Sequence, residues 1–158
     1  MRFFASSVGV MTVVAAALAG ASANAQSSAT TLLNVYEQAA SKACIRTAGC
    51  RVDFSTAPKN LRVQRVSCLI AVQTNQSPAL ISDFELGTAS SDQNNFTFGQ
   101  YLAPLQLLST AGADQFYIAN VATLHVVPAG SRPSILVITR IDPSVPIALQ
   151  CSIAGSFD

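Results

Sequence analysis

The C-terminal stretch Val145-Pro-Ile-Ala-Leu-Gln-Cys-Ser-Ile-Ala-Gly-Ser-Phe157 decides the fold class of this chain. Its large apolar side chains fall on one parity, and its small or polar side chains fall on the other. A period of two over this length predicts a β-strand with one buried face. Cys151 shares the parity of Ile147, Leu149 and Ile153, so we expect its sulfur to point into the core.

A second strand is expected directly upstream of this stretch. Ile135-Leu-Val-Ile138 is apolar on both parities, as in a strand that is covered on both faces. Asp142-Pro-Ser144 supplies turn-forming residues between the two strands. The sequence therefore predicts a β-hairpin over residues 134–157.

More strands are expected along the rest of the chain. The longest candidate spans residues 61–72 and carries Cys68, and the shorter ones span residues 84–86, 96–98, 105–108, 116–119 and 122–127. Turn-forming clusters separate them, which is typical of an all-β, antiparallel β-sandwich. We expect a disulfide-linked jelly roll of about eight strands, because early and late strands lie side by side in that fold. An immunoglobulin-like sandwich is the alternative, and the absence of tryptophan disfavours it.

Residues 30–43 fit two kinds of element. Four side chains have helical spacing, namely Leu32, Tyr36, Ala39 and Ala43, and Asn34 and Glu37 resemble a helix cap and its partner. The composition of residues 30–36 is equally typical of a strand. We favour a first strand that ends near Glu37.

The N-terminus has the pattern of a secretory signal peptide. Arg2 precedes an apolar run from Val8 to Leu18, and Ala23-Asn-Ala25 matches the small-residue cleavage pattern. The apolar run is shorter than the ~20 residues that a membrane-spanning helix needs. We therefore expect cleavage after Ala25, and a single domain over residues 26–158 that is periplasmic or extracellular and has no transmembrane segment.

All four cysteines follow the predicted cleavage site. An even number of cysteines in an exported protein predicts two disulfide bonds. The spacing favours Cys44–Cys50 as a local link and Cys68–Cys151 as a long-range link, although two other pairings are open. A zinc site is not expected, because the cysteines lack paired close spacing and the chain has one histidine. The sequence predicts no metal and no cofactor.

That histidine, His125, is the first candidate for catalysis. It shares its strand parity with Thr123 and opposes Leu124 and Val126, so we expect it on the more polar face of a strand. A histidine on the surface or in an interface fits this position better than a general base, because no nucleophile motif accompanies it.

Other candidate sites are weaker. Asp83 and Glu85 are two residues apart on one strand face, which is more typical of solvated charges than of a glycosidase pair. The loop Asp92-Gln-Asn-Asn95 lacks the ligand spacing of a calcium loop. Pro128-Ala-Gly130 resembles the proline–glycine turn of the cupin family, but the histidines of that family have no counterpart here. The sequence therefore predicts no catalytic residue.

The chain has 9 basic and 8 acidic side chains, so it lacks the basic excess of a nucleic-acid-binding protein. The charges are nevertheless uneven, with most basic residues before residue 66 and most acidic residues after it. Lys59, Arg62 and Arg65 form a candidate basic patch for a glycan or for an envelope or extracellular protein. Alternatively, acidic late segments pack beside these residues and cancel their field.

Three classes of function are compatible with these features. The leading hypothesis is an exported, non-catalytic domain with a structural or interaction-mediating role. The second is a carbohydrate-binding, lectin-like module, for which Tyr36, Tyr101, Tyr117 and a few phenylalanines could supply the aromatic surface. The third is a subunit of a surface fibre that assembles by strand exchange.

Overall fold

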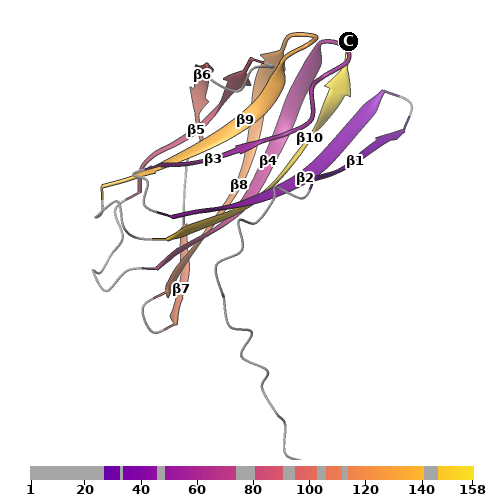
Figure 1. The fold of residues 1–158 in the computed structure, drawn as a ribbon. Coiled ribbons are helices and arrows are strands. Elements are labelled where there is room, and N and C mark those ends of the chain that lie inside the picture. The colour runs from indigo at the N-terminus through magenta and orange to yellow at the C-terminus, as the bar shows by residue number, and fades with distance from the viewer. Residues whose placement is uncertain are drawn as a thin grey trace, which may run out of the picture.

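The computed structural model describes residues 27–32, 34–45, 49–73, 81–90, 95–102, 106–111, 114–140 and 146–158. The described residues form the strands β1 (Ser27–Leu32), β2 (Val35–Cys44), β3 (Gly49–Asp53), β4 (Leu61–Gln73), β5 (Ile81–Ala89), β6 (Phe96–Tyr101), β7 (Gln106–Ala111), β8 (Asp114–Val127), β9 (Arg132–Thr139) and β10 (Ile147–Phe157) (Figure 1). No helix among the described residues is long and apolar enough to span a membrane.

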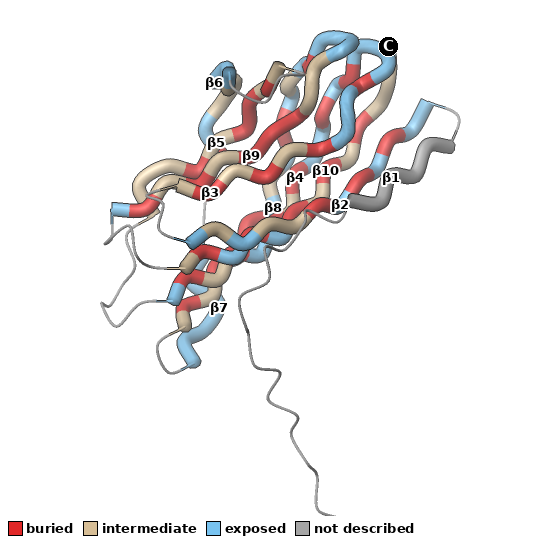
Figure 2. The backbone as a smooth tube through the Cα atoms, in the orientation of Figure 1, coloured by how far each residue is buried: buried red, intermediate tan, exposed pale blue. Residues whose placement is uncertain are grey.

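The strands form two antiparallel sheets that pack face to face. Sheet A has six strands in the order β1-β2-β10-β4-β8-β7, and sheet B has four in the order β3-β9-β5-β6. Buried residues alternate with more exposed ones along most strands, and the core lies between the sheets (Figure 2). The prediction of an all-β structure with antiparallel sheets packed together is confirmed, with ten strands in the described residues instead of about eight. The jelly-roll topology stays a prediction.

Strand β10 lies in the middle of sheet A, between β2 and β4. Ile147, Leu149, Cys151 and Ile153 are all buried in the core, as the alternation predicts. Burying each aliphatic side chain of this size stabilises the fold by about 1.5–3 kcal/mol. The alternating pattern thus fixes which side of β10 faces the core, and the side chains of the other parity point outward.

The two disulfide bonds have the pairing that the sequence favoured. Cys68 and Cys151 are directly opposite each other on β4 and β10, with 4.1 Å between their Cα atoms. Cys44 at the end of β2 is bonded to Cys50 in β3, with 5.5 Å between their Cα atoms. The first bond joins neighbouring strands of sheet A, whereas the second joins sheet A to sheet B.

The predicted hairpin over residues 134–157 is wrong. β9 lies in sheet B between β3 and β5, and β10 lies in sheet A. Turn-forming residues between two strands indicate a change of direction, but they do not show whether the next strand joins the same sheet. Here the chain changes sheets between β9 and β10.

The prediction for residues 30–43 is also wrong in detail, because β2 continues past Glu37 to Cys44 and the helical alternative does not occur. The buried side of β2 includes Tyr36, Gln38 and Ala40. The Tyr36 hydroxyl donates to Gln38 Oε1, and Gln38 Nε2 donates to Ser55 Oγ at 2.8 Å. A buried glutamine with internal partners interrupts the apolar alternation, so the alternation alone did not predict the full length of this strand.

Candidate functional site

The outer face of sheet A is a broad surface of mostly small side chains, which we call the sheet A face. Its residues are Ala39, Ser41 and Ala43 of β2, Ala148, Gln150 and Ser152 of β10, Ser67, Leu69 and Ala71 of β4, and Ile118 and Asn120 of β8. All of them are exposed or half-buried. They alternate with the core residues of the same strands, so they point away from sheet B.

The strand register places these residues in rows across four strands. In one row, Gln150 has Ser41 on one side and Leu69 on the other. Ile118 continues that row beyond Leu69. In the next row, Ser67 Oγ donates to Asn120 Oδ1 at 3.2 Å. The rows therefore form a regular surface with few protruding side chains.

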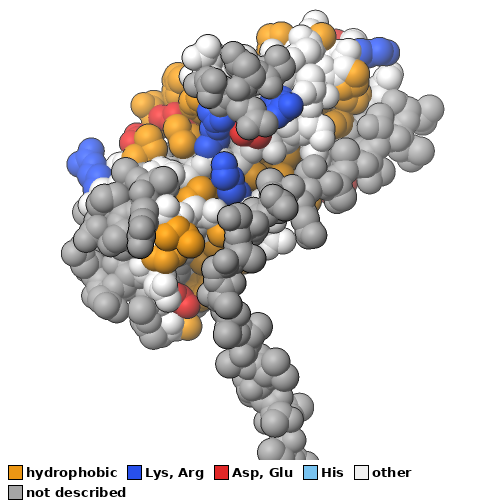
Figure 3. Space-filling view, viewed as in Figure 1, with side chains coloured by type: hydrophobic (Ala, Val, Ile, Leu, Met, Phe, Trp, Pro, Cys, Tyr) orange, Lys and Arg blue, Asp and Glu red, His pale blue; other side chains and the backbone are white. Residues whose placement is uncertain are grey.

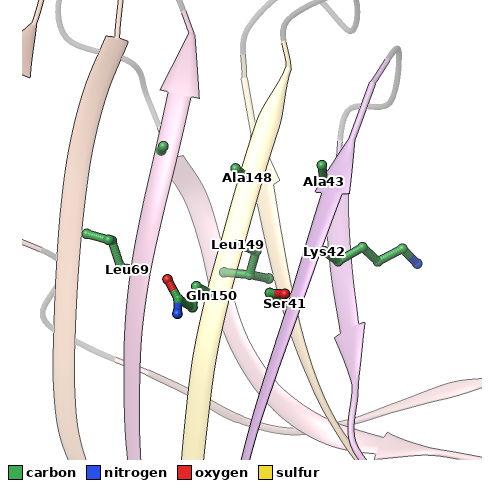
Figure 4. A pocket seen from close by; sticks show the side chains of 8 residues that line it. Ser41, Lys42, Ala43, Leu69, Ala148, Leu149 and Gln150 are labelled. Carbon is green, nitrogen blue, oxygen red and sulfur yellow. The ribbon is translucent and has the colours of Figure 1, made fainter. Parts of the chain in front are cut away.

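Two shallow hollows indent the sheet A face. The first has a volume of about 260 Å³, and the small side chains that line it include Ser41 and Ala43 of β2 and Ala148 of β10. Figure 4 shows Leu69 of β4 and Ser41 of β2 on either side of Gln150, while Lys42 extends away beyond β2. The second has a volume of about 500 Å³ and its lining includes Leu69, Leu108 and Ile118. The surface thus offers both apolar projections and space beside them.

Exposed apolar side chains gather at the β7 side of this face. Leu69 and Ile118 are exposed, and Leu108 of β7 is 61% exposed. Single exposed leucines are common on soluble proteins, but contiguous apolar patches mark interaction sites. The sheet A face shares the low content of charged residues that marks the centre of an interface, but it has more alanine and serine than such centres usually have.

Two opposite charges lie at one end of the sheet A face. Glu37 of β2 and Arg65 of β4 flank Ala154 of β10 in one row. Both side chains are exposed. In the described part of the chain, the ion pairs are Arg51–Asp53 and Arg62–Asp158, so neither Glu37 nor Arg65 belongs to one.

The residues of the predicted basic patch lie in β4 and in the loop before it. Lys59, Arg62 and Arg65 are all exposed. Arg62 Nη2 lies 3.1 Å from Asp158 Oδ2. This contact between an early basic residue and a late acidic one reduces the positive field of the patch.

His125 lies with Thr123 on the more polar face of β8, as the sequence predicts, but this face points toward sheet B and not to the surface. Its Nε2 lies 3.2 Å from Thr88 Oγ1 on β5, and its ring packs so closely on Gly99 that a Cβ there would overlap it. On the same face, Thr123 accepts a hydrogen bond from Gln100. Burial lowers the pKa of His125 below its usual value of 6.5.

The apolar neighbours of His125 are the exposed ones, since Leu124 is 77% exposed and Val126 is 50% exposed. This orientation differs from the general tendency of apolar residues to face the core. Polar partners on β5 and β6 make the inward orientation of Thr123 and His125 favourable.

The outer face of sheet B carries an aromatic pair, Phe98 and Tyr101 on β6. Their ring centroids are 4.8 Å apart, and the side chains are 49% and 65% exposed. Glu85 on β5 is opposite Tyr101, and burial together with the charge of Asp83 raises the pKa of Glu85. We call Phe98, Tyr101, Asp83 and Glu85 the aromatic patch. Figure 3, viewed from the sheet B side, shows charged side chains among hydrophobic ones.

The other two tyrosines are buried. Tyr36 packs edge to face on Phe157, and burial raises its pKa to about 12. The Tyr117 hydroxyl donates to Gln115 Oε1 at 2.8 Å. Of the three tyrosines that the sequence suggested for sugar stacking, Tyr101 alone is exposed.

Among the described residues, no group of three or more histidine, cysteine, aspartate or glutamate side chains could hold a metal ion. Most of the Asp92–Asn95 loop lies outside the described residues. Comparison with known protein families, curated proteins and solved structures finds no match to this chain.

Proposed function

We propose that this chain is an exported, non-catalytic β-sandwich domain that binds a protein partner through the sheet A face. The observation that carries the proposal is the row pattern of small and apolar side chains around Gln150, with two hollows between them. Small side chains allow the backbone of a partner to approach closely. Few charges have to be desolvated when such a surface is covered.

Two observations support the exported part of the proposal. The N-terminal segment has the pattern of a signal peptide. The two disulfide bonds fit an oxidising compartment, either periplasmic or extracellular. We keep the jelly roll as the proposed topology of the sandwich.

Site-specific photo-cross-linking in cells that express the full chain tests the proposal. A photoreactive residue at position 150 should cross-link to protein, because Gln150 is exposed in the centre of the sheet A face. The same residue in place of Ala129, which is exposed in the Pro128–Gly130 turn, serves as the control. Absence of a cross-linked product at position 150, or equal labelling at both positions, would overturn the proposal. So would a hydrolytic activity of the purified protein that one substitution abolishes.

The aromatic patch favours carbohydrate binding as a second candidate function. Exposed rings such as Phe98 and Tyr101 can cover the apolar face of a sugar ring, and carboxylates such as Glu85 can accept hydrogen bonds from its hydroxyls. A glycan array tests this candidate. We expect binding that Tyr101→Ala abolishes and that Leu124→Ala, an exposed apolar control on sheet A, leaves intact. An array without bound glycans would argue against it.

A further inference from the structure

We infer that the protein partner is a second copy of this chain, packed on the sheet A face about a two-fold axis parallel to β10. The inference rests on the proposed function and names the occupant of the surface. Its basis is that the sheet A face is complementary to itself in both charge and shape.

The position of β10 determines which strands would meet. β10 lies between β2 and β4. A two-fold axis that lies in the interface and follows β10 places β2 of one copy over β4 of the other. Such an interface is isologous, so each contact occurs twice. Two sheets packed in this way lie about 10 Å apart, with strand directions within about 30° of each other.

Charge complementarity follows directly from this arrangement. Glu37 and Arg65 lie on β2 and β4 at equal distances from Ala154, the β10 residue of their row. The two-fold rotation therefore places Glu37 of each copy opposite Arg65 of the other. Within one copy the two residues are two strand spacings apart, about 10 Å. Their long side chains can bridge a similar distance between the sheets.

Shape complementarity follows from the neighbouring row. Leu69 on β4 and Ser41 on β2 flank Gln150. The rotation places the exposed Leu69 of one copy over Ser41 of the other, beside the hollow of about 260 Å³. Gln150 lies near the axis and faces its own counterpart, where an amide can both donate and accept a hydrogen bond.

The size of the face indicates how stable this dimer would be. With the axis along β10, the five strands from β1 to β8 overlap, because β1 and β8 both lie two strands from β10. Five strands are about 24 Å wide and seven residues along β10 are about 23 Å long, so the overlapping area is roughly 550 Å² in plan. A standard interface buries about 800 Å² per partner, and smaller ones belong to weak, reversible complexes. We therefore expect a reversible dimer that dissociates at micromolar concentrations.

Sedimentation velocity of the oxidised protein from residue 26 onward measures dimerisation, and variants that exchange the charges of residues 37 and 65 test the inference. Glu37→Arg and Arg65→Glu should each weaken dimerisation by about tenfold or more, because each places like charges opposite one another. The double variant Glu37→Arg/Arg65→Glu should restore dimerisation to near the level of the original protein. Lys59→Glu, a charge reversal outside the sheet A face, should have little effect. Circular dichroism confirms that each variant is folded.

The outcomes separate this inference from the proposed function. A protein that is monomeric at all concentrations overturns the inference, and so does a double variant that fails to recover. Association that survives both single reversals also overturns it and indicates strand exchange at an edge such as β7. Cross-links from position 150 to another protein, with a monomeric purified chain, would leave the proposed function intact. Absence of cross-links and of dimers would overturn both.

Discussion

We expect the half-buried His125 to make the stability of the fold depend on pH. Burial lowers its pKa below 6.5, so the folded protein favours the neutral ring. As the pH falls through about 6.5, the unfolded chain binds a proton more readily than the folded one, and stability decreases. We expect the melting temperature to fall between about pH 7.5 and about pH 5.5, and to fall less in His125→Gln. Differential scanning calorimetry at both pH values measures the difference.

The glutamine variant retains an amide that can bond with Thr88, so it removes the titration with little change in packing. The raised pKa of Glu85 acts in the opposite direction, since its contribution to stability is lost as the pH rises. That contribution is present in both proteins and cancels in the comparison. Equal pH dependence of the two proteins would refute the role assigned to His125.

The absence of space for a side chain at Gly155 can be recognised only from the structure. Its parity in the C-terminal stretch indicates burial, and it is buried. The register of β10 on β4 shifts at this point, so a Cβ at Gly155 would overlap the carbonyl oxygen of Arg62. Because this neighbour belongs to another strand, the sequence pattern alone does not predict the constraint.

We expect Gly155→Ala to lower the free energy of unfolding by about 1–3 kcal/mol, as overpacked positions do. The backbone of β4 or β10 has to move to admit the methyl group. Ser152→Ala on the same strand is the control, because its side chain lies on the sheet A face. Urea denaturation measures both variants, and equal stability would show that the bulge accommodates a side chain.

At the scale of elements, periodicity predicted individual strands well and their arrangement poorly. The alternation in β10 predicted its buried side, including Cys151, and the spacing favoured the cysteine pairing that the structure has. The assignment of β9 and β10 to one hairpin failed because sheet membership depends on distant strands. The shared polar face of Thr123 and His125 was predicted correctly, but its inward orientation was not, because its polar partners, Thr88 and Gln100, lie on other strands.

The two disulfide bonds should differ in their effect on stability. Cys68–Cys151 has a sequence separation of 83, and the loop-entropy relation predicts about 4–5 kcal/mol for it. Cys44–Cys50 has a separation of 6, for which the same relation predicts about 2–2.5 kcal/mol. We expect Cys68→Ala/Cys151→Ala to lower the free energy of unfolding more than Cys44→Ala/Cys50→Ala does. Urea denaturation of the oxidised variants measures both.

The opposite order would also have a structural meaning. The long-range bond joins strands that are already hydrogen-bonded, whereas the short one joins sheet A to sheet B. If Cys44–Cys50 contributed more to the free energy of unfolding than Cys68–Cys151, the connection between the two sheets would limit stability. Loop entropy would then not be the dominant effect of the disulfide bonds.

At the scale of the whole molecule, the sequence predicted one strand of the candidate site but not the surface. The outward parity of β10 is visible in the sequence as Ala148, Gln150 and Ser152. Its neighbours in sheet A, β2 and β4, come from residues that are distant in the chain. The charge pair Glu37 and Arg65 and the row around Gln150 exist only when the three strands pair. Composition alone could not show that these residues share a face.

Self-association through the sheet A face should couple the stability of the molecule to its concentration. A dimer that forms between folded chains shifts the unfolding equilibrium by mass action. We therefore expect the melting temperature to rise as the protein concentration increases from about 5 µM to about 500 µM. Glu37→Arg should reduce the rise, because it places two positive charges opposite each other on both sides of the two-fold axis. Added salt should reduce it, since exposed ion pairs are screened. A melting temperature that does not vary with concentration would mean that the sheet A face is not covered by a second copy.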